Sequence, residues 1–179
     1  MNNKNLTIKE TFASAVQNHQ KNFFKIAENL YKEILKINPN HFGSIFYLGT
    51  LLVQTQRFKL AKSLLYKATQ INPNYAAAHN NLGATLKELG EYQNAINCCQ
   101  KAIKINPNYA DAHYNLGLVF KELGEFKKAI SCFKKAIQIH PSYINAHQNL
   151  MEAYEKTNQI TELKDAVSNA RTFFKDNSI

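Results

Sequence analysis

The prolines of this 179-residue chain are evenly spaced, and this spacing constrains the fold more than any other feature. They are Pro39, Pro73, Pro107 and Pro141. Each lies 34 residues from the next, and residues 76–109 align with residues 110–143 without a gap. A fixed period of this length is typical of stacked repeats, in which each unit buries its apolar face against its neighbours. The chain is therefore expected to form an array, and such arrays usually present a binding surface rather than carry out chemistry.

Within each unit, apolar residues recur at helical spacing in two runs. In residues 110–143 the first run ends at Leu123 and the second begins at Phe126, with Gly124 between them. Spacings of three and four place each run on one helix face. The break falls on glycine, which tolerates the left-handed conformation that ends many helices. The equivalent positions in the other units are Gly90, Asn22 and Asn158, which suit this conformation, and Gln56, which departs from the pattern. The second helix should end at the residue before each proline, because that residue disfavours the α region.

Small residues recur where the two helices of a unit would cross. Gly83 and Gly117 lie inside first helices, where glycine costs about 1 kcal/mol relative to alanine. We expect the missing side chains of these glycines to permit close packing against Ala95 and Ala129 of the second helices, which would offset this cost. The Asn-Leu-Gly at 81–83 and 115–117, these alanines, and the proline period together resemble the tetratricopeptide repeat family. The resemblance implies an all-α, right-handed α-solenoid of five helix-turn-helix units, or ten helices.

The resemblance extends over one predicted domain, residues 7–176. Its repeats are 8–41, 42–75, 76–109, 110–143 and 144–177. Thr7 and Glu10 have the spacing of a capping box that opens the first helix. In the last repeat, Met151 and Leu163 replace the small residues, so we expect that helix pair to be splayed. The apolar stripe of the last helix resembles a terminal cap, and continuation into an enzyme domain stays open.

Charge and hydropathy limit the partners. The net charge is +9, and residues 1–74 contribute +7, from ten Lys and Arg against three Asp and Glu. This imbalance suits an acidic partner or nucleic acid. Only Arg57 and Arg171 are arginines, however, so solvated lysine-rich faces are the favoured explanation. The N-terminus has no secretory signal pattern, and the apolar stretch 42–53 is about half the ~20 residues that a membrane span needs. We interpret it as a buried helix.

No catalytic, cofactor-binding or metal-binding residue is predicted. Cys98, Cys99 and Cys132 are an odd set without framework spacing, which indicates reduced thiols in a cytoplasmic compartment. Small apolar core residues are favoured over a redox pair or metal site. His79, His113 and His147 share the 34-residue period, but stacking holds equivalent side chains roughly 10 Å apart. They are therefore expected to pack between helices rather than to converge on a metal.

Three asparagines are the main candidate for binding. Asn81, Asn115 and Asn149 occupy one position in successive first helices, which line the concave groove in the resembling family. Repeats advance about 8–10 Å per step, and an extended peptide advances about 3.3 Å per residue. One asparagine would therefore meet about every third residue, and its carboxamide pairs with a backbone amide whatever the side chains. These three asparagines, here called the asparagine ladder, resemble the one in the superhelix of O-linked N-acetylglucosamine transferase. The sequence pattern Asn-Leu-Gly-x-x-x-Lys-Glu of the repeats is also similar to that protein's.

Neighbouring groove positions give the predicted site its character. Tyr114, Lys87 and Lys121 would read side chains, and Asn80 adds polarity. Phe46 and Tyr47 make the N-terminal part apolar, which suits a partner, self-association or packing between repeats. The predicted function is a non-catalytic scaffold that binds an extended partner segment. The alternatives are an accessory domain of a larger enzyme, such as a glycosyltransferase, and a basic nucleic-acid binder.

Overall fold

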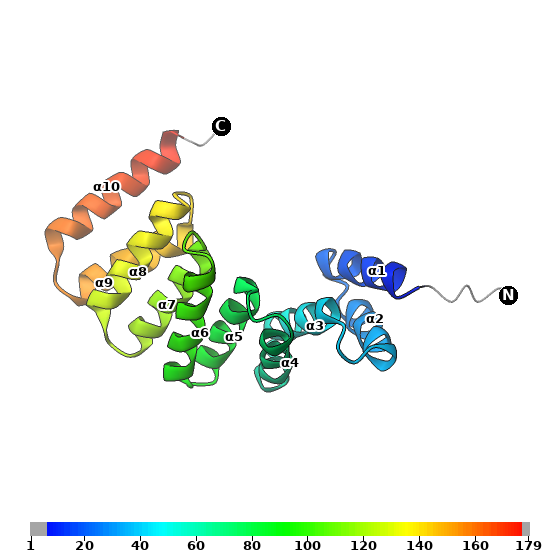
Figure 1. The fold of residues 1–179 in the computed structure, drawn as a ribbon. Helices are drawn as coiled ribbons and strands as arrows, with labels where there is room; N and C mark the ends of the chain where they lie inside the picture. Colours follow the sequence, from blue (N-terminus) through cyan, green and yellow to red (C-terminus); the bar gives the residue numbers. More distant parts are fainter. Residues whose placement is uncertain (1–6, 177–179) are drawn as a thin grey trace. The chain divides into compact units, whose positions relative to one another are not determined.

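The computed structural model describes residues 7–176, apart from the side chains of Phe174 and Asp176. In this range the chain forms ten α-helices and no strand (Figure 1). The helices are α1 (Ile8–Gln20), α2 (Phe24–Ile37), α3 (Phe42–Gln54), α4 (Phe58–Ile71), α5 (Ala76–Glu88), α6 (Tyr92–Ile105), α7 (Ala110–Glu122), α8 (Phe126–Ile139), α9 (Ile144–Lys156) and α10 (Ile160–Asp176). The predicted all-α fold of helix-turn-helix units is confirmed.

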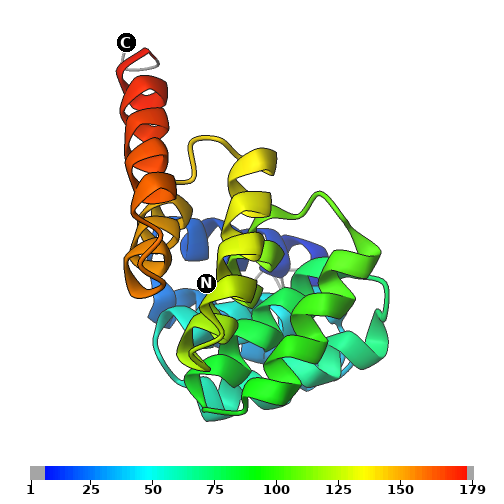
Figure 2. The same ribbon diagram turned by 90° about the vertical axis from the view of Figure 1, so that its left-hand side faces the viewer.

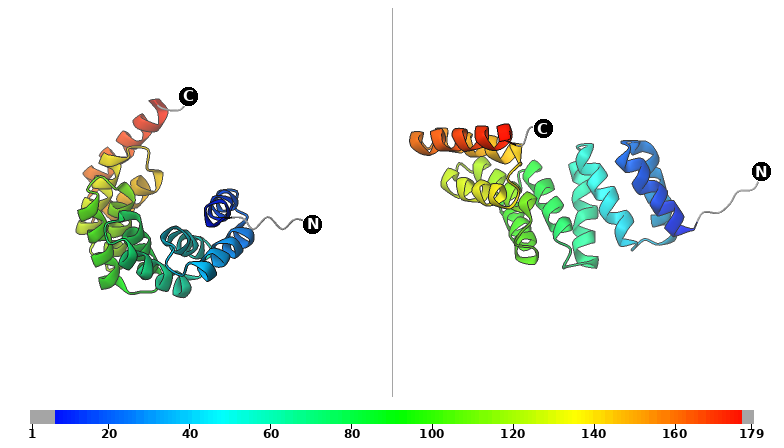
Figure 3. Two further views of the ribbon diagram at one scale, coloured as in Figure 1. Left: turned by 45° about the vertical axis from the view of Figure 1, so that its right-hand side comes forward. Right: turned by 90° about the horizontal axis from the view of Figure 1, so that it is seen from above.

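The helices belong to two compact units, Met1–Leu89 and Gly90–Ile179. In the first unit each helix from α1 to α5 packs against the next, and the first helices α1, α3 and α5 also contact one another in turn. Figure 3 shows α1 with α2, in blue, and α3 with α4, in cyan to teal, as successive pairs. In the second unit α6 to α10 pack in order, so α9 contacts both α8 and α10 (Figure 2). The same pairing rule therefore builds both units.

The turns inside the repeats adopt the predicted left-handed backbone. The φ angles are 61° at Asn22, 57° at Gln56, 73° at Gly90, 71° at Gly124 and 55° at Asn158. The second helices end where the prolines predict, with extended or near-extended backbone at Asn38, Asn72, Asn106 and His140. Local residue choice thus favours both kinds of turn except at Gln56, which holds the left-handed backbone without glycine or asparagine, and the 34-residue period follows from the alternation of the turns.

The N-terminal cap is also as predicted. The Glu10 carboxylate accepts from the Thr7 backbone N–H at 2.9 Å, and the Glu10 N–H donates to Thr7 Oγ1 at 3.3 Å. This capping box satisfies orphan backbone groups at the start of α1.

The three periodic histidines have a structural role in the turns between repeats. The Nε2 atoms of His79, His113 and His147 lie 3.0, 3.0 and 2.8 Å from the carbonyl oxygens of Pro73, Pro107 and Pro141. Each ring therefore donates Nε2–H to the proline carbonyl six residues earlier, a neutral ring leaving Nδ1 as acceptor. The histidines recur every 34 residues because each one hydrogen-bonds to a proline-containing turn between repeats.

The close crossing of helices inside a repeat depends on glycine, but its neighbour differs from the expected one. A Cβ built on Gly117 would lie 2.6 Å from Cε1 of Phe133, a distance that real contacts do not show. Phe133 is fully buried, and its ring fills the space that the glycine leaves open. Ala129 is also fully buried, but it does not supply the nearest atoms as we expected. The close approach is therefore between a helix backbone and an aromatic ring.

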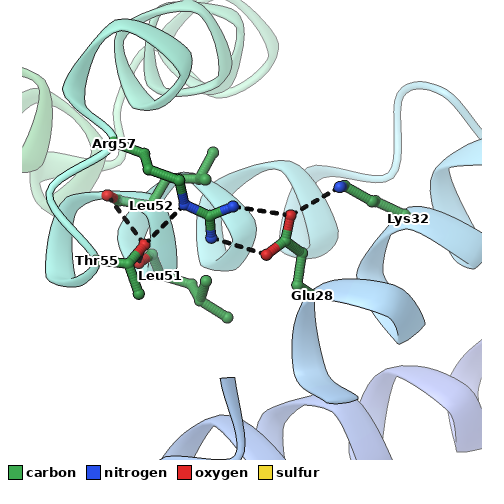
Figure 4. Close-up of polar contacts among 6 residues, drawn as sticks. All are labelled: Glu28, Lys32, Leu51, Leu52, Thr55 and Arg57. Atoms are coloured by element: carbon green, nitrogen blue, oxygen red, sulfur yellow. Dashed lines mark hydrogen bonds and ion pairs between the residues drawn. The ribbon is translucent and has the colours of Figure 1, made fainter. Parts of the chain in front are cut away.

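One ion pair ties the first repeat to the second (Figure 4). The Glu28 carboxylate on α2 accepts two bonds from the guanidinium of Arg57, from Nη1 at 3.1 Å and Nη2 at 2.7 Å. Lys32 Nζ lies 2.7 Å from the same carboxylate, and Arg57 Nε donates to Thr55 Oγ1 at 3.0 Å. The bonds from Arg57 are the main reason that the pKa of Glu28 falls to about 2.

The apolar stretch at 42–53 forms α3, whose side chains Ile45, Leu48, Leu51 and Leu52 are buried. Across the described residues no helix combines the length and hydropathy needed to cross a bilayer. The interpretation of this stretch as a buried helix is confirmed.

Candidate functional site

The best-defined polar cluster on the first helices surrounds Asn149 of α9. Lys121 Nζ, on α7, donates to Asn149 Oδ1 at 2.7 Å and lies 2.9 Å from Glu152 Oε2. Asn149 Nδ2 donates to the Tyr114 hydroxyl at 3.3 Å and to the Asn145 carbonyl at 2.9 Å. The structure thus brings together three predicted site residues, Asn149, Lys121 and Tyr114, from two successive first helices.

Asn81 in the first unit is held in a similar way. Its Nδ2 donates to Thr50 Oγ1 of α3 at 3.0 Å, and its Oδ1 accepts from Asn80 Nδ2 at 3.4 Å. Asn81 is half-buried, whereas Asn80 is only 4% exposed. The Asn80 side chain therefore supports Asn81 more than it offers a surface of its own.

Asn115 and Lys87 complete the predicted polar set. Asn115 is half-buried on α7, at the position that Asn149 occupies on α9. Lys87 lies 2.6 Å from Glu88 Oε1, and its side chain is 18% exposed. Its charge is thus already balanced by its neighbour on α5.

The predicted aromatic residues lie in packed ring clusters. Phe46 is 7% exposed and meets Tyr75 edge-on, with ring centroids 5.0 Å apart. Tyr47 is half-buried and stacks on Tyr31 at 6.3 Å. Aromatic packing within repeat 42–75 thus accounts for most of the Phe46 surface, and Tyr47 keeps part of its ring accessible.

The second unit has an equivalent aromatic join. The Tyr114 and Tyr143 rings lie 4.8 Å apart, and the Tyr143 hydroxyl donates to Asp111 Oδ1 at 2.9 Å. Burial is the main cause that raises the pKa of both tyrosine hydroxyls. Both rings therefore remain neutral at ordinary pH and serve as hydrogen-bonding aromatic surface.

A pocket of about 270 Å³ lies beside Tyr47 in the first unit. It is lined by Val16, His19, Gln20, Asn22, Tyr47, Thr50 and Gln54. His19 is 7% exposed, with Nε2 2.9 Å from Gln54 Oε1 and Nδ1 3.3 Å from the Tyr31 hydroxyl. The lining side chains include no Asp, Glu, Lys or Arg, so the pocket suits neutral polar groups.

The cysteines are free, and Cys99 is fully buried. Burial raises the pKa of the Cys99 thiol to about 12, and of the Cys98 and Cys132 thiols to about 11. These values favour the inert thiol over the nucleophilic thiolate. Among residues 7–176, no group of three His, Cys, Asp or Glu side chains is placed to hold a metal ion.

Sequence reasoning missed the partners that cross from one repeat to the next. Thr50 and Glu152 bond to predicted residues of a neighbouring repeat, and Arg57 reaches a carboxylate 29 positions earlier. The available signal was the repeat period itself, since each partner stands near a position that faces the neighbouring unit.

Family models match the middle of the chain. The one described as "TPR repeat" matches residues 85–124, and three described as "Tetratricopeptide repeat" match residues 110–143, 64–97 and 44–75. Together they cover residues 44–143. No curated protein sequence matches the chain significantly.

Solved structures match almost the whole chain. A structure titled "Crystal structure of MamA protein" is 30% identical, with a TM-score of 0.82 over 96% of each chain. A second, titled "Crystal structure of MamA", is 32% identical over 90% of this chain and 96% of that one, with a TM-score of 0.79. TTC0263, described as a thermophilic TPR protein in Thermus thermophilus, is 21% identical over 92% and 90%, with a TM-score of 0.76, and supports the fold alone.

Proposed function

Because the chain belongs to the tetratricopeptide repeat family, we propose that it is a non-catalytic module that holds an extended segment of a partner protein against its first helices. One observation carries the proposal. Asn81 and Asn149 stand at the same helical position, and each is hydrogen-bonded to the first helix of the preceding repeat. Their carboxamides are thus fixed before any partner arrives, which lowers the entropic cost of binding.

The bonds already made determine what each carboxamide offers. Asn149 uses both N–H groups and one oxygen lone pair, so its remaining capacity is to accept a bond from a backbone N–H. Asn81 uses one N–H toward Thr50, and among the described residues its second N–H has no acceptor. In the second unit a partner backbone would therefore donate to Asn149, and in the first unit a partner backbone would accept from Asn81.

The number of available bonds sets the expected affinity. Each net hydrogen bond contributes about 0.5–1.5 kcal/mol, before the cost of ordering the segment. A few such bonds correspond to binding on the order of micromolar or weaker. Lys121 and Tyr114, which hold Asn149, and Tyr47 beside the neutral pocket would add side-chain selectivity.

We also propose a cytoplasmic location, which the odd number of cysteines without framework spacing supports. The partner in this proposal is a protein. Self-association through the apolar N-terminal repeats has weaker support, because little of the Phe46 surface is accessible. Nucleic acid also has weaker support, since the cations are mostly lysines on solvated faces.

The similarity of the repeat wording to O-linked N-acetylglucosamine transferase supports a variant of this proposal. In the variant, the repeats would present a protein substrate to a catalytic domain encoded in the same gene. The reading frame of the gene decides between the separate binding module and this variant. A glycosyltransferase domain continuous with the repeats supports the variant, and a stop codon after Ile179 contradicts it.

The test is to select peptides from a phage-displayed random library on the wild-type protein, then measure their affinity for Asn→Ala variants. The triple variant Asn81→Ala, Asn115→Ala, Asn149→Ala should bind at least about tenfold more weakly. The matched control replaces Asn29, Asn97 and Asn169, which are exposed on second helices. Equal affinities for the wild type and the Asn81–Asn115–Asn149 variant would exclude the ladder.

A further inference from the structure

The pocket between α1 and α3 lies where the second unit places a long side chain of its own. His19, which lines the pocket, is equivalent to Lys121 of α7. Lys121 reaches across to α9, where its ammonium group donates to Asn149 and pairs with Glu152. The residues of α3 at these two partner positions also line the pocket, and they are Tyr47 and Thr50. The first unit therefore has an open space where α7 extends an unbranched side chain with a polar end.

A buried pair of side chains fixes the carboxamide of Gln54 at one wall of this pocket. Because Gln54 Oε1 can only accept, the His19 ring donates to it through Nε2–H, over 2.9 Å. In the neutral ring Nδ1 then accepts from the Tyr31 hydroxyl at 3.3 Å. Among the described residues, neither N–H group of the Gln54 amide nitrogen has an acceptor. The pocket thus holds two hydrogen-bond donors in place before any ligand arrives.

The lining offers apolar contact and hydrogen bonds but no charge. Val16 and Tyr47 supply apolar surface, and the carboxamides of Gln20 and Asn22 lie at the same pocket as that of Gln54. A charged side chain would lose hydration there without meeting an opposite charge. An aliphatic side chain would cover the N–H groups of Gln54 and leave them unpaired.

Glutamine matches both parts of this lining. Its methylenes can contact Val16 and Tyr47, its carbonyl can accept from Gln54, and its own N–H groups can donate to the neighbouring carboxamide oxygens. Asparagine has the same polar end on a shorter stem, whereas the equivalent space in the second unit takes the long stem of Lys121.

We propose that this pocket binds the side chain of a glutamine in the extended partner segment. The inference rests on the proposed function, because the glutamine belongs to the same segment. Asn81 donates to Thr50 Oγ1 at 3.0 Å, and Thr50 lines the pocket, so a backbone group at Asn81 and a side chain in the pocket lie close together. The asparagine ladder pairs with any backbone, and the pocket adds a preference for one residue type.

The direct test is an NMR titration of the full chain with N-acetylglutamine methylamide. The matched probes are the glutamate, leucine and lysine derivatives. We expect the glutamine derivative to shift the side-chain N–H signals of Gln54 in a saturable way, on the order of millimolar, and the other three to bind at least about tenfold more weakly. Absence of these shifts, or equal affinities for the four derivatives, overturns the proposal.

A change of specificity locates the ligand. Gln54→Glu keeps an oxygen that can accept from His19 and adds a charge, so this variant should bind the lysine derivative better than the glutamine derivative. Gln70→Glu is the matched control, because Gln70 is exposed on α4 of the same unit, and it should keep the wild-type order. A Gln54→Glu variant that keeps the wild-type order also overturns the proposal.

Peptide selection separates this inference from the proposed function. Peptides selected on the wild type should carry glutamine at one position, and those selected on Gln54→Glu should carry lysine or arginine there. Peptides that depend on the asparagine ladder but show no such preference overturn the inference and leave the proposed function standing. If the glutamine derivative binds and no peptide is selected, the proposed function fails while the preference of the pocket for glutamine stands.

Discussion

The ion pair between Glu28 and Arg57 makes the stability of the first unit depend on pH in a predictable way. Folding lowers the pKa of Glu28 from 4.5 to about 2, chiefly through its bonds from Arg57. A group with a depressed folded-state pKa stabilises the protein above its unfolded-state pKa and loses that contribution as pH falls through the folded-state value. The contribution of Glu28 should therefore be complete above about pH 5 and decline toward about pH 2.

The geometry bounds the size of this contribution. The pKa difference corresponds to about 3 kcal/mol as an upper limit. The Glu28 side chain is only 11% exposed, but Arg57 is 37% exposed, so solvent screens part of the attraction. We therefore expect Glu28→Gln, which keeps the shape and removes the charge, to destabilise the first unit by about 1–3 kcal/mol near pH 7.

The measurement is urea unfolding by circular dichroism for the wild type, Glu28→Gln, Arg57→Gln and the double variant, at several pH values between about 2 and 7. Glu33→Gln is the matched control, since Glu33 is exposed on the same helix. Its effect should be below about 0.5 kcal/mol. The coupling energy between Glu28 and Arg57 should reach about 1–3 kcal/mol near pH 7 and shrink as the pH falls. A coupling near zero, or a Glu28→Gln effect that is the same at both ends of the range, would refute the reasoning.

Three further predictions follow from the packing. Gly117→Ala should destabilise the second unit by about 1–3 kcal/mol in urea unfolding, because the added Cβ meets the buried ring of Phe133 at 2.6 Å; an unchanged midpoint would show that the ring moves freely. Gln56→Gly should stabilise the first unit by about 1 kcal/mol in the same assay, because Gln56 holds a left-handed φ of 57°; a loss of stability would contradict this. Burial raises the pKa of the Cys99 thiol to about 12, so Ellman's reagent should label this residue in folded protein at least about tenfold more slowly than in guanidinium; equal rates would contradict it.

The local features of the fold were predictable because short stretches of sequence determine them. The left-handed turns at Asn22 and Gly90, and the capping box of Thr7 with Glu10, each depend on residues within one or two helical turns. The burial of α3 followed from its largely apolar composition, in which no Asp, Glu, Lys or Arg occurs. Periodicity then extended each local rule to every repeat.

The contacts of the candidate site were less predictable because they join residues about 30 positions apart. The bonds from Lys121 and to Tyr114 depend on how far α9 is displaced along α7, which the period does not specify. The ring of Phe133 beside Gly117 has a similar origin, since side-chain packing decides which residue of the second helix fills the space. The sequence indicates which positions face a neighbour, and the structure shows which neighbour each one meets.

One position illustrates how repeats with a common fold acquire different surfaces. The equivalent residues are His19, Val53, Lys87 and Lys121. His19 bonds to Gln54 and helps to line an uncharged pocket, whereas Lys121 bonds to Asn149 and Glu152. Because these partners come from the first helix of the following repeat, the chemistry of the position can change together with theirs while the stack stays the same. The face formed by α1 and α3 should therefore select neutral and aromatic groups, and the face formed by α7 and α9 should select groups that pair with a lysine or an asparagine.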